Sequence, residues 1–195
     1  MSRDFFVVDL EFTQYRKQVG RPMGFFSEII EIGAVKITGD THEIAGNIQN
    51  FVKPHFYPKQ AKESMEFCSI TEADMKTAID FATMLKEIEK LYTPGKTYFV
   101  AWGMEDYNVI EKGCERYQLA NPILLEDCLD LAAAYKHMNN HDYTTSLRMA
   151  TEEHDISAEG HWHAAYEDAL KTGKLLQKLL ADGWKPEDYF AAIET

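Results

Sequence analysis

Two acidic residues interrupt an apolar segment near the start of the chain. Residues 5–12 read FFVVDLEF, so Asp9 and Glu11 stand two positions apart in a run typical of a β-strand. Because side chains alternate between the faces of a strand, both carboxylates point to one face and Leu10 to the other. Neighbouring carboxylates repel each other unless a cation lies between them, so the pair indicates ligands for a divalent metal. The alternative is the solvent-facing side of a half-buried strand, which the pair alone does not exclude.

Two later segments carry three further residues with chemical potential. Residues 100–110 read VAWGMEDYNVI and include Asp106, and residues 161–170 read HWHAAYEDAL and include His163 and Asp168. Residues five apart in a helix differ in direction by about 140°, so His163 and Asp168 cannot share one helical face. We therefore expect Asp168 on the first turns of the last long helix, with His163 in the loop or at the cap just before it.

The pattern of apolar residues predicts the elements that hold these side chains. Short apolar runs rich in branched residues predict strands, and apolar residues at helical intervals predict helices. Strands are expected at 5–10, 29–37, 44–52, 98–102 and 122–128, and helices within 71–92 as one or two segments, then at 104–118, about 129–138, 144–153, 164–181 and from Pro186 onwards. The two prolines of 54–60 predict an irregular crossing. The first three strands are expected to form an antiparallel meander within a mixed sheet.

Composition limits the kind of protein. A chain of 195 residues, 45% of them hydrophobic, can bury one sizeable core, and no linker or repeat marks off a second domain. The three cysteines, Cys68, Cys114 and Cys128, lie far apart and fit neither a disulfide framework nor a Cys-x-x-Cys metal site. We therefore expect a single domain in a reducing cytoplasm. No stretch reads as a signal peptide or a membrane span.

The net charge bears on the class of partner. A formal charge of -12 argues against a protein that coats long duplex nucleic acid, since such binding depends on lysine and arginine. It does not exclude a nuclease. An enzyme that binds a few nucleotides at a chain end can neutralise phosphates with divalent cations, which themselves require acidic ligands.

The acidic segments together resemble the DEDDh exonucleases of the DnaQ-like superfamily. That family has Asp-x-Glu on its first strand, an Asp shortly after a later strand, and a His followed five positions later by an Asp. The matching positions in this chain, in the same order, are Asp9 and Glu11, then Asp106, then His163 and Asp168. Each motif arises often by chance, whereas all three in order are specific.

Finer features are similar to one branch of this family, the branch of histone-mRNA-type and KapD-type sporulation-inhibitor exonucleases. They are IIEIGAVKI at 29–37, Phe67-Cys68 before Ile70-Thr71, and Trp102-Gly103-x-x-Asp106. The resemblance implies an RNase H-like fold, α/β, with a mixed five-stranded sheet, an antiparallel N-terminal meander and flanking helices. We expect one exonuclease domain over 1–195, with the motif-bearing core at about 5–181 and a C-terminal helix at 186–194. The segment 20–27 and the stretch after Trp184 match no motif.

The resemblance also implies a mechanism. Asp9 bridges two ions, Mg²⁺ or Mn²⁺, Glu11 and Asp168 hold one of them, and Asp106 acts directly or through water. His163 is the general base, because an imidazole titrates near neutral pH. The expected reaction is hydrolysis of phosphodiester bonds at the 3′ end of single-stranded RNA or DNA, with release of 5′-mononucleotides.

Substrate-binding residues are expected beside the acidic pair. Phe12 and Thr13 follow it directly, where the family holds the terminal nucleotide, although Phe12 is equally compatible with the core. Arg16, Lys17 and Arg21 form a basic cluster that either meets upstream phosphates or is simply solvated. Trp102 follows a buried strand, which favours packing over stacking on a base.

Other polar residues have plainer interpretations. His154, His161 and His163 suggest a zinc cluster, but no cysteine lies near them and no repeated ligand pair appears. Glu28 and Glu31 are interpreted as structural or solvated.

Two rival functions remain. The first is a non-catalytic nucleic-acid-binding or regulatory protein that keeps the fold, against which the full set of carboxylates argues, since such a cluster is destabilising without metal. The second is an enzyme for very short oligonucleotides or another small phosphodiester, which the negative charge slightly favours. The sequence does not choose RNA over DNA, and protein partners are unknown.

Overall fold

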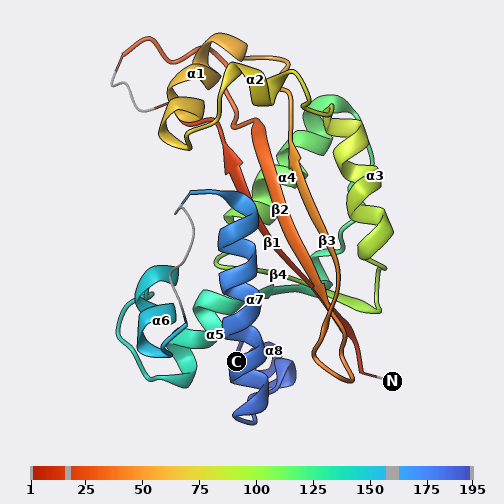
Figure 1. Cartoon of the computed structure of the whole chain (residues 1–195), viewed down its shortest axis with the longest axis vertical. Helices are drawn as coiled ribbons and strands as arrows, with labels where there is room; N and C mark the ends of the chain where they lie inside the picture. Colours follow the sequence, from red (N-terminus) through yellow and green to blue (C-terminus); the bar gives the residue numbers. More distant parts are fainter. Residues whose placement is uncertain (1, 16–18, 157–162, 194–195) are drawn as a thin grey trace.

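The computed structural model describes residues 2–15, 19–156 and 163–193. Within these residues the strands form one five-stranded sheet in the order β3-β2-β1-β4-β5 (Figure 1). The strands are β1 Asp4–Phe12, β2 Ile29–Ile37, β3 Ile44–Phe51, β4 Thr97–Ala101 and β5 Cys128–Asp130. β2 pairs antiparallel with β1 and β3, whereas β4 pairs parallel with β1 and β5. The predicted mixed sheet with an antiparallel N-terminal meander is confirmed.

Helices cover both faces of this sheet. The helices are α1 Pro58–Phe67, α2 Glu72–Met75, α3 Phe81–Leu91, α4 Glu105–Tyr117, α5 Leu131–Met138, α6 Leu147–Glu153, α7 Ala165–Ala181 and α8 Pro186–Ile193. In Figure 1, α7 crosses β1 and β2 on the near face, and α5, α6 and α8 lie around its lower half. α3 and α4 pack on the other face, while α1 and α2 lie at the upper end of the sheet.

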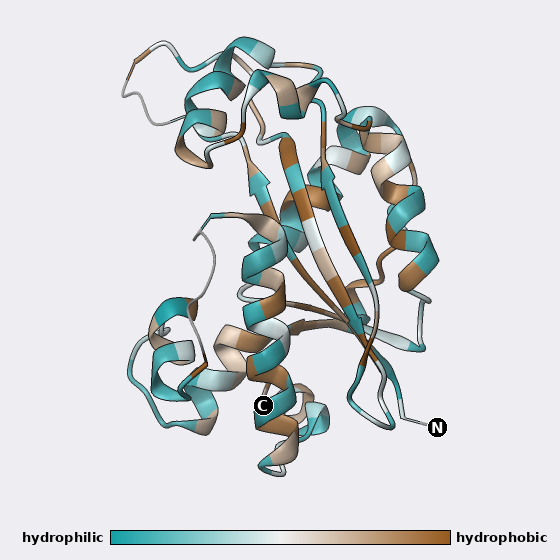
Figure 2. Cartoon of the chain, in the orientation of Figure 1, coloured by the Kyte–Doolittle hydropathy of each residue, from teal (hydrophilic) through white to brown (hydrophobic). Residues whose placement is uncertain are grey.

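Alternate side chains of β1 enter two separate apolar cores. Phe6 and Val8 pack with buried residues of α3 and α4, and Phe5 and Val7 pack with buried residues of α5, α7 and α8. Brown and teal alternate along α3 and α7 in Figure 2, as expected for helices with one face on the sheet and the other in solvent. The odd-numbered residues of β1 therefore face α7.

Two segments differ from the sequence-based prediction. The irregular crossing expected over 54–60 is wrong in its second half, because α1 begins at Pro58, and proline suits the first position of a helix, where no N–H partner is needed. The last strand is present, but it lies after most of the expected range 122–128. Leu125–Asp127 forms a 3-10 turn and β5 begins only at Cys128, since the buried Asp127 carboxylate accepts hydrogen bonds from Tyr92 and Gly95 and fixes the turn.

The predicted helical region 71–92 contains two helices, α2 and α3, separated by a short turn. Among the helices of the described residues, none combines the length and the apolar character that a bilayer crossing requires.

Candidate active site

β1 carries Asp9 and Glu11 to the face that α7 covers, because both residues continue its odd-numbered alternation. The neighbouring strand β2 places Gly33 opposite Asp9 and Glu31 opposite Glu11. Three carboxylates and a glycine thus share one small area of the sheet, directly beneath the start of α7.

Gly33 allows the first turn of α7 to lie against β2. A Cβ on Gly33 would stand 2.0 Å from Tyr166 N and 2.1 Å from the Ala165 carbonyl carbon, so any side chain there would displace the helix. The Glu31 carboxylate accepts a hydrogen bond from the Ala165 N–H. It thereby satisfies one of the free donors at the helix N-terminus, where no side chain of Ala164 is available to do so.

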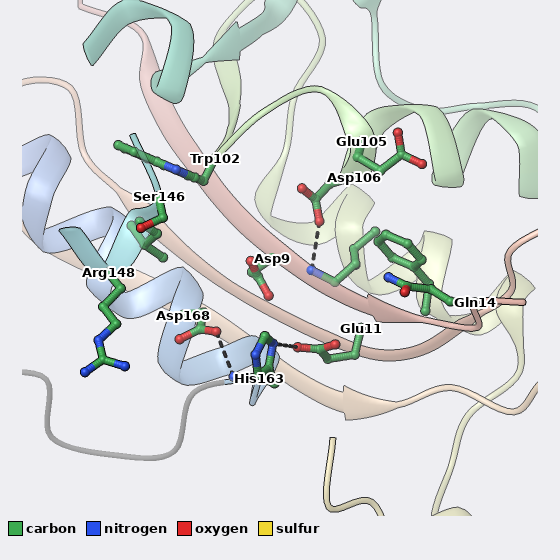
Figure 3. Close-up of a pocket in the computed structure, with 13 residues that line it drawn as sticks. Asp9, Glu11, Gln14, Trp102, Glu105, Asp106, Ser146, Arg148, His163 and Asp168 are labelled. Atoms are coloured by element: carbon green, nitrogen blue, oxygen red, sulfur yellow. Dashed lines mark hydrogen bonds and ion pairs between the residues drawn. The ribbon is translucent and has the colours of Figure 1, made fainter. Parts of the chain in front are cut away.

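Asp168 lies in the first turn of α7, and His163 lies in the turn before the helix. His163 has a left-handed backbone, with φ of 65°, which directs the chain into α7. Its N–H donates to Asp168 Oδ2 at 3.0 Å, and its ring Nδ1 lies 3.9 Å from Glu11 Oε1 (Figure 3). The prediction that Asp168 stands on the helix and His163 just outside it is confirmed.

The carboxylates from β1 and α7 converge. One oxygen from each of Asp9, Glu11 and Asp168 lies within 4.8 Å of the others, a spacing that a divalent cation with oxygen ligands can bridge. Asp106, in the first turn of α4, lines the same cleft from the other side of β1 but is not part of this 4.8 Å group. Its Oδ1 accepts a hydrogen bond from Leu10 N–H at 2.9 Å, beyond the point where β4 stops pairing with β1.

Burial and mutual repulsion raise the pKa values of these carboxyl groups. The pKa of Asp9 is raised well above its ordinary value, chiefly by burial and then by the charges of Asp106, Asp168 and Glu11. Burial raises the pKa of Asp106 to about 7 and also raises that of Glu11, although hydrogen bonds from Leu10 and Cys68 act in the opposite direction. A divalent cation would offset this concentration of negative charge, so the residues present fit a metal.

The end of α1 supports two members of the site. Cys68 Sγ donates a hydrogen bond to Glu11 Oε2 at 3.0 Å. The Phe67 ring packs on the His163 ring, with centroids 4.7 Å apart and an interplanar angle of 52°. Because the sequence did not predict α1, it gave no indication that this segment reaches the cluster.

The carboxylates line an open cleft of about 540 Å³ (Figure 3). Its described lining consists of Asp9, Leu10, Glu11, Phe12, Gln14, Trp102, Glu105, Asp106, Ser146, Leu147, Arg148, His163 and Asp168. In Figure 3, Trp102, Ser146 and Arg148 lie on one side of Asp9, and Glu11 and Gln14 on the other. The predicted carboxylates and histidine are therefore brought together in one cleft.

Sequence reasoning missed several of the lining residues. Gln14, Glu105, Ser146 and Arg148 belong to no motif, and only the three-dimensional arrangement brings them to the cleft. Trp102 is half-buried and does pack, as expected, since its Nε1 donates to the Thr145 carbonyl at 3.1 Å. It also lines the cleft, which its sequence context did not indicate.

Only some of the residues predicted to bind substrate lie in the cleft. Phe12 lines the cleft, but Thr13 is fully buried and its hydroxyl accepts a hydrogen bond from Glu28 N–H at 2.9 Å, so its side chain does not reach the cleft. Arg21 is exposed, does not line the cleft, and packs over the Phe25 ring at 5.3 Å. Arg16 and Lys17 lie outside the described residues.

A histidine zinc cluster does not form among the described residues, where Asp9, Glu11 and Asp168 make the one candidate metal-binding group. His154 ends α6 and packs on Tyr135 instead, and His161 lies outside the described residues.

Glu28 is structural, as expected. It is buried, and its carboxylate accepts hydrogen bonds from the N–H groups of residues 55–57.

A mixed five-stranded sheet of this order, with acidic side chains from the central strand and two flanking helices in one cleft, defines the RNase H-like class of metal-dependent nucleases. The sequence comparison narrows this class. The model of the family described as Exonuclease matches residues 6–176, so the chain belongs to this family. Within the family it is a DEDDh, DnaQ-like 3′-to-5′ exonuclease.

Two curated relatives indicate the branch. The chain is similar to the probable 3′-5′ exonuclease KapD of Bacillus subtilis, with 29% identity over 181 residues that cover 93% of this chain and 86% of that protein. It is also similar to human ERI1 exoribonuclease 2, with 27% identity over 80% of this chain. The match spans only 26% of that longer human protein.

Solved structures share the fold. The nuclease domain of 3′hExo, a DEDDh family member bound to rAMP, superposes with a TM-score of 0.80 at 22% identity, covering 93% of this chain and 94% of that one. Escherichia coli exonuclease I in complex with a dT13 oligonucleotide superposes with a TM-score of 0.68 at 15% identity, covering 91% of this chain and 41% of that one. At these identities the likeness establishes the fold alone.

Proposed function

We propose that this chain is a single exonuclease domain that removes 5′-mononucleotides from the 3′ end of single-stranded RNA or DNA, with two divalent cations and His163 as general base. The observation that carries the proposal is the convergence of Asp9, Glu11 and Asp168 within 4.8 Å, with Asp106 and His163 in the same cleft. A regulator without catalysis would have little use for a cluster whose charges raise one another's pKa values.

The metal would be Mg²⁺ or Mn²⁺, held by Asp9, Glu11 and Asp168, with Asp106 as a further ligand, direct or through water. When bound, such ions activate a water molecule and neutralise the charge that develops on the phosphate and on the leaving oxygen. Before binding, the hydrogen bonds from Leu10 N–H to Asp106 and from Cys68 to Glu11 already hold two of these carboxylates in place. Less reorganisation is then required when the ions enter.

His163 is proposed as the group that takes the proton from the attacking water. Its side chain is 57% exposed, so the ring lies at the mouth of the cleft rather than within its floor. Two contacts hold it there: the ring packs on Phe67, and the backbone N–H is bound by Asp168. A base in this position meets the substrate from the solvent side, where it can pass the proton on to bulk water.

The substrate is proposed to be a flexible strand end. The relatives and structural neighbours include an exoribonuclease and complexes with rAMP, with a histone mRNA stem-loop and with dT13. They support a nucleic-acid substrate and are compatible with either ribose or deoxyribose. The cleft is strongly acidic, and Arg148 is the one lysine or arginine among its described lining residues. We propose that Arg148 contacts a substrate phosphate, because its side chain is 67% exposed and its ion pair with Glu152, Nε to Oε1 at 3.0 Å, lies at the surface.

The proposal is tested with end-labelled single-stranded RNA and DNA of several lengths, incubated with Mg²⁺, with Mn²⁺ or with a chelator. Cleavage is expected with either metal and none with the chelator. Asp9→Ala is expected to remove activity, while Asp40→Asn, a change of an exposed acid in the β2–β3 turn, is expected to retain it. Cleavage by Asp9→Ala at the rate of the unmodified enzyme would contradict the mechanism.

A further inference from the structure

A buried lysine lies directly behind the metal-binding cluster. Lys171 is on α7, one turn after Asp168, and only 3% of its side chain is exposed. Its Nζ lies 3.0 Å from Asp168 Oδ1. Burying an ammonium group is energetically costly unless it is paired and hydrogen-bonded. The ion pair with Asp168 therefore stabilises Lys171 in its buried position.

The two oxygens of Asp168 have different donors. Oδ1 accepts from the Lys171 ammonium and Oδ2 from the His163 N–H, each at 3.0 Å. Two donors on opposite oxygens fix the plane of a carboxylate, because rotation about its side-chain bonds would break one of them. Asp168 is therefore oriented before any cation is present.

Lys171 does not itself reach the substrate site. Asp168 lines the cleft, whereas Lys171 is absent from the cleft lining and approaches Asp168 from the interior of the protein. Its contact with the proposed metal-binding cluster is through Asp168. A second lysine on the same helix shows the contrast, since Lys178 and its partner Asp182 are 47% and 50% exposed and form an ordinary surface pair.

We propose that Lys171 is a positioning residue, which holds the carboxylate of Asp168 in the orientation that binds the metal, while each oxygen, with one hydrogen bond accepted, keeps a further lone pair for coordination. The proposal rests on the proposed function, because it assigns Asp168 to the metal. No motif of the sequence includes Lys171; only the burial and the two short contacts of its partner point to this role.

The test measures Mn²⁺ binding directly, by titration calorimetry and by the electron paramagnetic resonance signal of free Mn²⁺, without nucleic acid. Lys171→Met keeps the length of the side chain and removes its charge; it is expected to weaken Mn²⁺ binding at least about tenfold, the effect of losing one hydrogen bond to a charged group. Lys178→Met is the matched control and is expected to bind Mn²⁺ like the unmodified protein. Lys171→Arg, which keeps the charge, is expected to recover most of the affinity.

Activity gives a second readout. In Lys171→Met, a higher Mn²⁺ concentration is expected to restore kcat, with the KM for the oligonucleotide unchanged, because only metal binding is affected. Unchanged or tighter Mn²⁺ binding in Lys171→Met would overturn the proposal and leave the proposed function intact.

Failure of the unmodified protein to bind Mn²⁺ would overturn both. If Lys171→Met does not fold, Lys171→Gln takes its place beside Lys171→Arg, and equal Mn²⁺ affinities of these two variants would overturn the role of the charge.

Discussion

At the scale of single residues, the site is a set of carboxylates held close together against their own repulsion. Asp9 is the centre of this arrangement, since its pKa is raised by burial and by the charges of Asp106, Asp168 and Glu11. The repulsion among these carboxylates lowers the stability of the metal-free protein but provides ligands for a cation, as is common in active sites.

Asp9→Asn should separate stability from activity. Removing the charge relieves repulsion within the cluster, so the metal-free variant is expected to melt a few degrees above the unmodified protein, at about 2–4 °C per kcal/mol. Exonuclease activity is expected to fall at least about 1,000-fold, because a ligand of the metal is lost. Calorimetric melting and a rate assay check the two effects, with Asp40→Asn as the control. A variant that melts lower than the unmodified protein would contradict the electrostatic account.

At the scale of elements, three segments supply the carboxylates of the cleft, and each is fixed by a specific feature. β1 presents Asp9 and Glu11 by strand alternation, α4 places Asp106 in its first turn, and α7 places Asp168 in its first turn. The position of α7 depends on Gly33, because the helix backbone occupies the space where a side chain would stand.

Gly33→Ala is expected to displace the start of α7. A Cβ there would lie 2.0 Å from the Tyr166 nitrogen, and backbone cannot yield as a flexible side chain does. We expect a loss of about 1–3 kcal/mol or more in the free energy of unfolding and at least a tenfold loss of activity. Gly173→Ala is the matched control, because Gly173 lies on α7 and packs against β2 in the same helix–strand interface. Its Cβ would meet only Val35 Cγ2 at 3.0 Å and Ile37 Cδ1 at 3.3 Å, so a smaller effect is expected.

Denaturant unfolding and a rate assay compare the two variants. If Gly33→Ala were as stable and as active as Gly173→Ala, the close packing of α7 on β2 would not be what positions Asp168.

The sequence predicted the parts of this arrangement that have a period or a fixed spacing. Alternation placed Asp9 and Glu11 on one face, and the five-residue spacing placed His163 outside the helix that holds Asp168. It did not predict α1, whose opening proline resembled a loop signal, so the support that Phe67 and Cys68 give to the site was also missed.

Local sequence patterns did not predict contacts between segments that are distant in the sequence. Arg148 reaches the cleft from α6, and Lys171 pairs with Asp168 inside the protein, but neither follows from local spacing. Thr13 shows the converse, since its position beside the acidic pair suggested substrate contact and the structure buries it completely. Adjacency in the sequence predicts the face of a strand and not the depth of a side chain.

At the scale of the whole molecule, the charge cluster couples metal binding to pH. Burial raises the pKa of both Asp106 and Glu31 to about 7. In the unfolded chain, the pKa of such a carboxyl group is about 4. The folded protein thus binds these protons more tightly than the unfolded chain does. The stability they contribute is complete below about pH 4 and is lost as the pH rises through about 7.

Mn²⁺ should therefore stabilise the protein more at pH 8 than at pH 6, because it binds the deprotonated carboxylates and replaces the lost protons. Melting temperatures with and without Mn²⁺, at both pH values and equal ionic strength, check this expectation. Potassium chloride of matched ionic strength is the control and should show no such dependence. An equal rise in Tm at both pH values would contradict the coupling.

The central claim is directional hydrolysis at a 3′ end, and it is tested most directly by the products formed from a blocked and an unblocked strand. A 5′-labelled single-stranded oligonucleotide with a free 3′-hydroxyl is incubated with the enzyme and Mn²⁺, beside the same strand carrying an inverted 3′-terminal nucleotide. We predict progressive shortening of the free strand from its 3′ end, 5′-mononucleotides as the released product, and an intact blocked strand. Internal cleavage of both strands, or no cleavage of either, would contradict the account.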